Sequence, residues 1–267
     1  METRSRIVIG ATVISACAAV SVLATTWVPK DVVCPLCGTT NKLQEIASFG
    51  GYIYGWPSKF QQIFWPATES EAFYSCRSCR LTCLMSDFVE LPKDKFDAVK
   101  KQLADVSFDR EYDDYTKIPM SQKLAVAERV YSVLDKDDRF QCWFQRVKGY
   151  HLEKEARTET GEVDEAKQKL ADDARRKAIE LADKMMKDEG NAGLQKELLL
   201  IRGAMKHFLK DDTGALADFT KAVDMKYTNK KMDPKRAESI DENLTSLLKE
   251  YVELIKNPQK AIKANVD

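Results

Sequence analysis

The stretch "YSCRSCRLTC", residues 74–83, places three cysteines within eight positions, and "CPLCG", residues 34–38, holds two more. In each stretch two cysteines are separated by two residues, a spacing that lets both sulfurs reach one metal ion. Two such turns supply the four thiolates of a closed tetrahedral zinc site, which is structural because no position remains open for water. The predicted zinc ligands are Cys34, Cys37, Cys76 and Cys79.

The third cysteine of the opening stretch, Cys83, leaves two interpretations open. It is either a small apolar side chain packed in the core, as free cysteines often are, or the fourth ligand in place of Cys79. The second case requires a helical turn after Cys79. Arg80 also stands where the first pair has Gly38, and a left-handed turn is harder for arginine than for glycine.

Two other uses of the cysteines compete with zinc. In an oxidising compartment the array could form disulfides, although a disulfide framework does not require two C-x2-C turns. "CPLC" also looks like a thioredoxin-type redox pair, but that chemistry needs a helix N-terminus within a βαβ unit, which the following "GTTNKLQEIASFGGYIYGWP" does not indicate. The spacing therefore favours zinc.

The N-terminus predicts export from the cytosol. Arg4 and Arg6 precede an uncharged run at 7–28, which has roughly the ~20 residues that span a bilayer, so the remainder is expected outside the cytoplasm. The run could remain as an anchor in the cell envelope, be cleaved after Ala24 to give a periplasmic or secreted protein, or carry a lipid on Cys17. Beyond residue 28 the net charge is −1, which disfavours nucleic acid as the partner.

Periodicity predicts a mainly α fold after this segment. We expect a signal segment at 1–30, a small zinc-ribbon-like β region at 31–92, an adapter at 93–120, an antiparallel helical-repeat bundle at 121–257 and a tail at 258–267. Apolar residues recur at helical spacing within 96–106, 124–134, 140–151, 170–185, 198–208, 216–223 and 240–254. Nine aromatic residues lie between the cysteine pairs, and we expect them to pack this region against the helices rather than to form a partner surface.

One helix pair carries a more specific pattern. In "LLLIRGAMKHFLKDDTGALADFTKAVDM", residues 198–225, Gly203, Ala215, Phe219 and Ala222 stand where a small residue lets two helices approach and an aromatic ring fills the gap. Residues 196–229 therefore resemble a tetratricopeptide repeat, and the resemblance implies a concave protein-binding surface.

The whole arrangement resembles a known kind of protein. The cysteine pairs are followed by "IPMSQKLAVAERVY" (118–131) and "CWFQRVKGYHLEKEA" (142–156) and then by the repeat-like helices. Over 32–229 the chain is similar to an uncharacterised bacterial family that joins a zinc-ribbon-like region to tetratricopeptide-like helices. The resemblance implies an architecture and no activity.

The sequence indicates no enzyme. Its two histidines, His151 and His207, lie on predicted helices, and the chain has no HExxH, GxSxG or phosphate-loop motif. We therefore expect a protein-interaction scaffold with one structural zinc, a membrane-associated N-terminus and a protein or peptide partner. The alternatives are an exported thiol-disulfide oxidoreductase using Cys34 and Cys37, and a dimerisation element.

Overall fold

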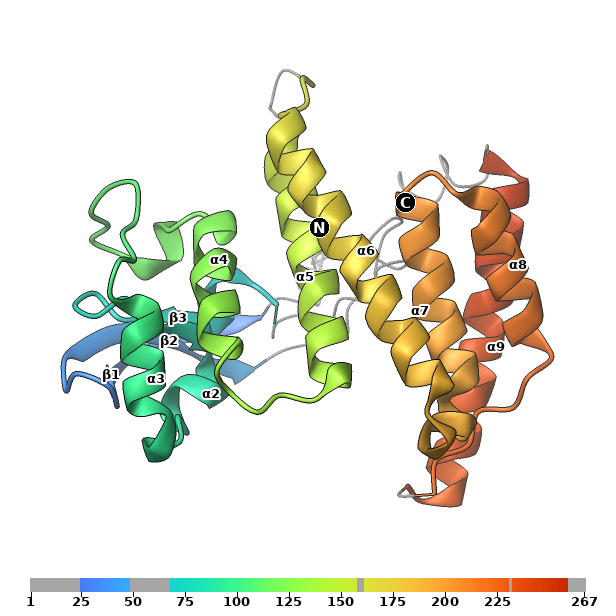
Figure 1. The fold of residues 1–267 in the computed structure, drawn as a ribbon, viewed down its shortest axis with the longest axis horizontal. Coiled ribbons are helices and arrows are strands. Elements are labelled where there is room, and N and C mark those ends of the chain that lie inside the picture. The colour runs from blue at the N-terminus through green and yellow to red at the C-terminus, as the bar shows by residue number, and fades with distance from the viewer. Residues whose placement is uncertain (1–24, 49–67, 158–160, 231, 259–267) are drawn as a thin grey trace, which may run out of the picture.

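The structure is a computed structural model that describes residues 25–48, 68–157, 161–230 and 232–258. Within these ranges it has eight α-helices and two small antiparallel sheets, which confirms the mainly α prediction. The strands and the helices within 85–131 lie on one side of the molecule, and the helices within 165–256 lie on the other. Helix α5 (Asp138–Ala156) lies between them (Figure 1).

The apolar run at 7–28 falls almost entirely outside the described residues, so the predicted N-terminal helix is not part of this description. Its last three residues belong to strand β1, which begins at Thr26. No helix in the described ranges is both long enough and apolar enough to cross a membrane.

Each cysteine pair lies in the loop of a β-hairpin. Strands β1 (Thr26–Val33) and β2 (Thr40–Ser48) pair with Val33 opposite Thr40, and β3 (Phe73–Ser75) and β4 (Thr82–Leu84) pair with Ser75 opposite Thr82. Both loops therefore have six residues, with cysteines at the first and fourth positions. Two hairpins of equal loop length present their cysteines in the same way.

Helices begin where short acidic side chains can cap them. Asp137, Asp164, Asp211 and Asp233 each accept a hydrogen bond from a backbone N–H in the first turn of the helix that follows. Such caps satisfy donors that have no partner within the helix. Two of these caps lie in acidic clusters of the sequence, "DKDD" at 135–138 and "KDD" at 210–212. The helices are α2 (Met85–Val89), α3 (Phe96–Leu103), α4 (Met120–Tyr131), α5 (Asp138–Ala156), α6 (Glu165–Lys187), α7 (Gln195–Phe208), α8 (Asp212–Val223) and α9 (Pro234–Lys256).

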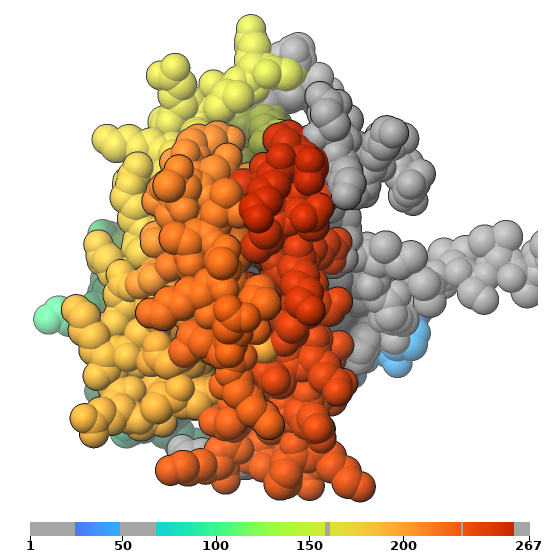
Figure 2. Space-filling model, turned by 90° about the vertical axis from the view of Figure 1, so that its right-hand side faces the viewer, coloured from blue at the N-terminus to red at the C-terminus, as the bar shows by residue number. Residues whose placement is uncertain are grey.

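Helices α5–α9, called here the long helices, pack as neighbours in chain order. Helices α5 and α6 form one antiparallel pair and α7 and α8 a second, and α9 packs against α8 (Figure 1). Figure 2 shows α8 and α9 covering the end of the molecule that lies farthest from the strands. A Cβ atom on Gly203 would lie 2.5 Å from the Phe219 ring, so glycine is what lets α7 and α8 approach this closely.

Two apolar cores meet at α5. The first joins the hairpins to α2, α3 and α4 and includes Phe144 of α5. The second lies among α6–α9 and includes Cys142 of α5 and Phe219. Because α5 contributes a different face to each core, the cysteine region and the helical pairs can differ in what stabilises them.

Candidate metal centre

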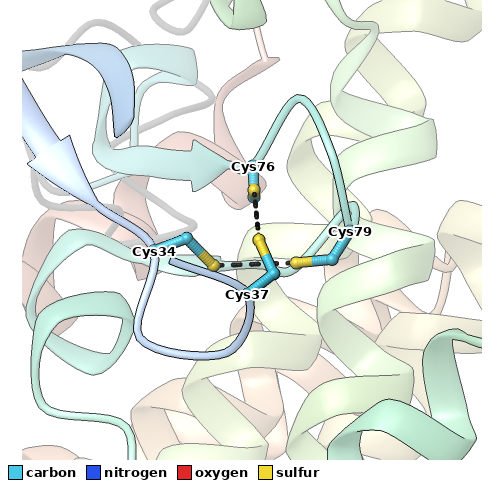
Figure 3. Close-up of side chains that lie close together, drawn as sticks. All are labelled: Cys34, Cys37, Cys76 and Cys79. Carbon is cyan, nitrogen blue, oxygen red and sulfur yellow. Dashed lines mark hydrogen bonds between the residues drawn. The ribbon is translucent and has the colours of Figure 1, made fainter. Parts of the chain in front are cut away.

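The two hairpin loops bring four sulfur atoms to one point (Figure 3). The Sγ atoms of Cys34 and Cys79 are 3.6 Å apart, those of Cys37 and Cys76 are also 3.6 Å apart, and all four lie within 4.8 Å of one another. Four thiolates around Zn²⁺ with Zn–S bonds of about 2.3 Å would be about 3.8 Å apart. These separations are too long for a disulfide, whose S–S bond is ~2.05 Å. The arrangement is compatible with one shared metal ion.

The two loops have the same backbone. The N–H of the first cysteine donates to the carbonyl oxygen five residues later, over 2.9 Å in each loop, from Cys34 to Thr39 and from Cys76 to Leu81. The residue after the second cysteine adopts a left-handed conformation in both, with φ of +75° at Gly38 and +61° at Arg80. Arg80 therefore adopts the conformation that glycine supplies in the first loop, and both loops aim their thiols alike.

The thiols of the cluster lie close enough to shift one another's pKa. Hydrogen bonding to Cys34 and Cys79 lowers the pKa of the Cys76 thiol, whereas hydrogen bonding to Cys34 and Cys76 raises the pKa of Cys79. Hydrogen bonding to Cys76 also raises the pKa of Cys34 to about 12. A thiolate at one sulfur is thus stabilised by protons on its neighbours. Four thiolates at these distances require a compensating positive charge, which a divalent metal ion supplies.

Burial makes the site closed on most sides. Cys34 and Cys76 are buried, Cys79 is half-buried, and Cys37 is exposed. Four sulfur donors complete a tetrahedral coordination sphere, so a zinc ion held here would have no position for a water molecule or substrate. The donor set therefore fits a structural ion.

Asn41 of β2 contacts both cysteine loops through its side chain. Its side-chain Nδ2 donates to the Thr39 carbonyl oxygen at 2.9 Å and lies 3.7 Å from the Cys76 Sγ, while its Oδ1 accepts the Arg77 N–H at 3.0 Å. This buried amide thus ties the two loops together and directs an N–H toward one sulfur. Such outer contacts orient ligands and tune metal affinity. Asn41 could not be predicted from the sequence, because no spacing rule marks it.

The two other cysteines of the described ranges, Cys83 and Cys142, lie away from the cluster, and Cys17 falls outside those ranges. Cys83 is fully buried in β4, and burial raises the pKa of its thiol well above the usual range. Residues 82–84 form a strand, so the helical turn that would make Cys83 the fourth ligand is absent and that alternative is wrong. Cys142 is buried in the second core, with its Sγ 3.5 Å from the Ala178 carbonyl oxygen.

Neither histidine joins the cysteines. His151 is buried, its Nε2 lies 2.7 Å from the Thr68 carbonyl oxygen, and burial lowers its pKa to about 4. His207 has its Nδ1 2.6 Å from the Asp212 carboxylate. Of the nine aromatic residues between the cysteine pairs, Phe73 and Tyr74 are buried in the first core, as the packing prediction requires, and the other seven lie outside the described ranges.

Comparison with protein-family models, with curated proteins and with solved structures finds no match for this chain.

Proposed function

We propose that the protein is a non-enzymatic scaffold of the cell envelope. A structural zinc ion bound by Cys34, Cys37, Cys76 and Cys79 would stabilise a zinc-ribbon-like domain, and the long helices would bind a protein or peptide. The observation that carries the proposal is the convergence of four thiols from two hairpin loops of equal length and equal backbone conformation. Such duplicated turns are typical of a metal site that holds a small domain together.

The first core explains why a structural metal is useful here. The two sheets have only two strands each, and isolated two-stranded sheets are marginally stable in water. The loops of these sheets meet at the four sulfurs and at Asn41, which bridges them. A metal ion would therefore link two hairpins that have little secondary structure of their own.

The helical part supports the binding role in the proposal. Gly203 packs on the ring of Phe219, and Ala215 and Ala222 are fully buried beside it, which is the packing that the tetratricopeptide pattern describes. The pair α5–α6 precedes this pair and α9 follows it. Stacked helix pairs of this kind present surfaces to peptides and proteins. The proposed location rests on the basic residues and apolar run at the N-terminus.

Replacing Cys34 by Ser separates this function from thiol-disulfide exchange, the rival use of the same residues. In a scaffold the variant loses metal ligation, and its thermal unfolding midpoint falls, because serine cannot replace a thiolate ligand. The wild-type protein is also expected to show no catalysed reduction of insulin disulfides by dithiothreitol. The unfolding midpoint and the rate of insulin reduction are measured on the purified wild type and on the purified Cys34→Ser variant.

The opposite pattern would overturn the proposal. An oxidoreductase predicts catalysed insulin reduction by the wild type and a folded Cys34→Ser variant that has lost it. Cys83→Ser, at a buried cysteine outside the cluster, is the matched control and should keep the bound metal ion.

A further inference from the structure

A polar cleft of about 750 Å³ opens beside the second cysteine loop. Its lining comes from strands β1 and β2, from the second loop and from residues 108–118, the connector before α4. The lining includes four basic side chains, Lys42, Arg77, Arg80 and Arg110. No sequence motif marks this connector, and the proposed scaffold function does not use the cleft.

The basic side chains of the cleft are available to a ligand. None of the four forms an ion pair with any described residue. Several other arginines of the described ranges do form ion pairs, as Arg139 does with Glu197 and Arg202 with Asp183. Asp31, Glu111 and Asp113 also line the cleft, but each lies beyond ion-pair distance of these cations. The cleft thus keeps unneutralised guanidinium groups within a concave surface.

Arg110 comes from the connector and packs on an aromatic ring. Its guanidinium carbon lies 4.9 Å from the centre of the Tyr112 ring. Arg77 and Arg80 come from the second loop, where the backbone N–H of Arg77 donates to Asn41. A metal ion bound to the cysteines would fix this loop further. Arginines from two separate segments thus line one cleft.

The backbone at Arg80 indicates that its side chain has a function. Gly38 and Arg80 occupy equivalent positions with φ of +75° and +61°, a region that side chains with a Cβ rarely adopt. The first loop shows that glycine meets the requirement of the turn without this strain. Strained residues cluster at active sites and ligand clamps. Forming the turn alone does not explain arginine at this position.

We propose that this cleft binds a small ligand through an oxyanion group, a carboxylate or a phosphate, held by Arg77, Arg80 and Arg110. The planar guanidinium matches both groups with paired N–H donors. Residues Tyr112 and Phe108 offer apolar surface beside the cations for the rest of the ligand. The acidic residues of the lining would exclude ligands of high negative charge.

Binding is tested by isothermal titration of the metal-loaded full chain with inorganic phosphate and, separately, with succinate. The wild type is expected to bind at least one of them saturably, and the tighter of the two identifies the oxyanion. Replacing Arg80 with glycine should weaken that binding about tenfold or more, as loss of a charge-assisted contact implies. The same variant should unfold at an unchanged or higher temperature, because glycine relieves the left-handed backbone.

Two further variants complete the test. Arg110→Ala, on the connector, should weaken binding to a similar extent without affecting the cysteine loop. Arg176→Ala, which removes an exposed arginine paired with Asp173 on α6, should leave binding unchanged. The proposal is overturned if neither anion binds the wild type saturably, or if Arg80→Gly and Arg110→Ala bind as tightly as the wild type. An Arg80→Gly variant that is less stable and still binds would assign Arg80 a purely structural role.

Discussion

Replacing Cys76 by Ser is expected to abolish metal binding and to unfold the cysteine region while the long helices remain folded. Cys76 is buried, belongs to the four-sulfur cluster and receives the contact from Asn41. Structural zinc sites contribute apparent binding free energies of about 10–16 kcal/mol in small domains, far more than two short hairpins can replace. The first core should therefore lose its order when the ion is lost.

The region that unfolds in Cys76→Ser is as informative as the extent of unfolding. Hydrogen exchange should show lost protection in β1–β4 and in α2, and retained protection in α7, α8 and α9, which belong to the second core. Cys83→Ala is the matched control, because Cys83 is fully buried in the same core but lies outside the cluster. It should keep its metal ion. A Cys76→Ser protein that retains metal and full protection would contradict the assignment of Cys76 as a ligand.

Phe219→Ala is expected to be the most destabilising single change in the helical part. Phe219 is fully buried between Gly203 of α7 and Tyr251 of α9, whose ring centre is 5.5 Å away. Glycine at 203 has no side chain that could fill the resulting cavity. Truncation of a buried phenylalanine costs about 3–5 kcal/mol. In a chain of this size the unfolding midpoint of the helical part should fall by on the order of 10 °C.

Thermal unfolding followed by circular dichroism measures this change. Leu170→Ala is the control, because Leu170 lies on α6 and its side chain is half exposed. The control should shift the midpoint by little. If Phe219→Ala shifted it no more than Leu170→Ala does, the close packing of α7 and α8 would not be what stabilises this part of the protein.

Seven of the eight described helices could be predicted from sequence because each has an apolar stripe, and four of them begin at an acidic cap. All seven periodic stretches correspond to helices in the structure. Helix α2 was missed, since its five residues are too short to show a period. The prediction of short strands in the cysteine region was also confirmed. Their pairing into two matching hairpins depends on register, which one sequence does not determine.

Buried charges could not be predicted from the helical pattern. Lys123, Arg175 and Lys196 are almost wholly buried, although periodicity places no charge in a core. Each finds a partner far away in sequence: Lys123 donates to Ser70, Arg175 pairs with Glu153, and Lys196 pairs with Asp241. Such pairs form only once the tertiary fold brings the partners together.

In the candidate site, too, local features could be predicted from the sequence and contacts between distant residues could not. The convergence of the four cysteines could be predicted because two-residue spacing is a local property of a turn. The contact from Asn41 to Cys76 spans 35 residues and depends on the register of β2, so no local pattern indicates it. The left-handed conformation of Arg80 runs against residue preference and could be seen only by comparing the two loops in space.

X-ray absorption at the zinc edge, combined with the metal content of the purified chain, tests the structural metal site most directly. The account predicts about one zinc ion per chain with four sulfur neighbours at about 2.3 Å. A chain that contains no zinc and whose cysteines form disulfides would contradict it.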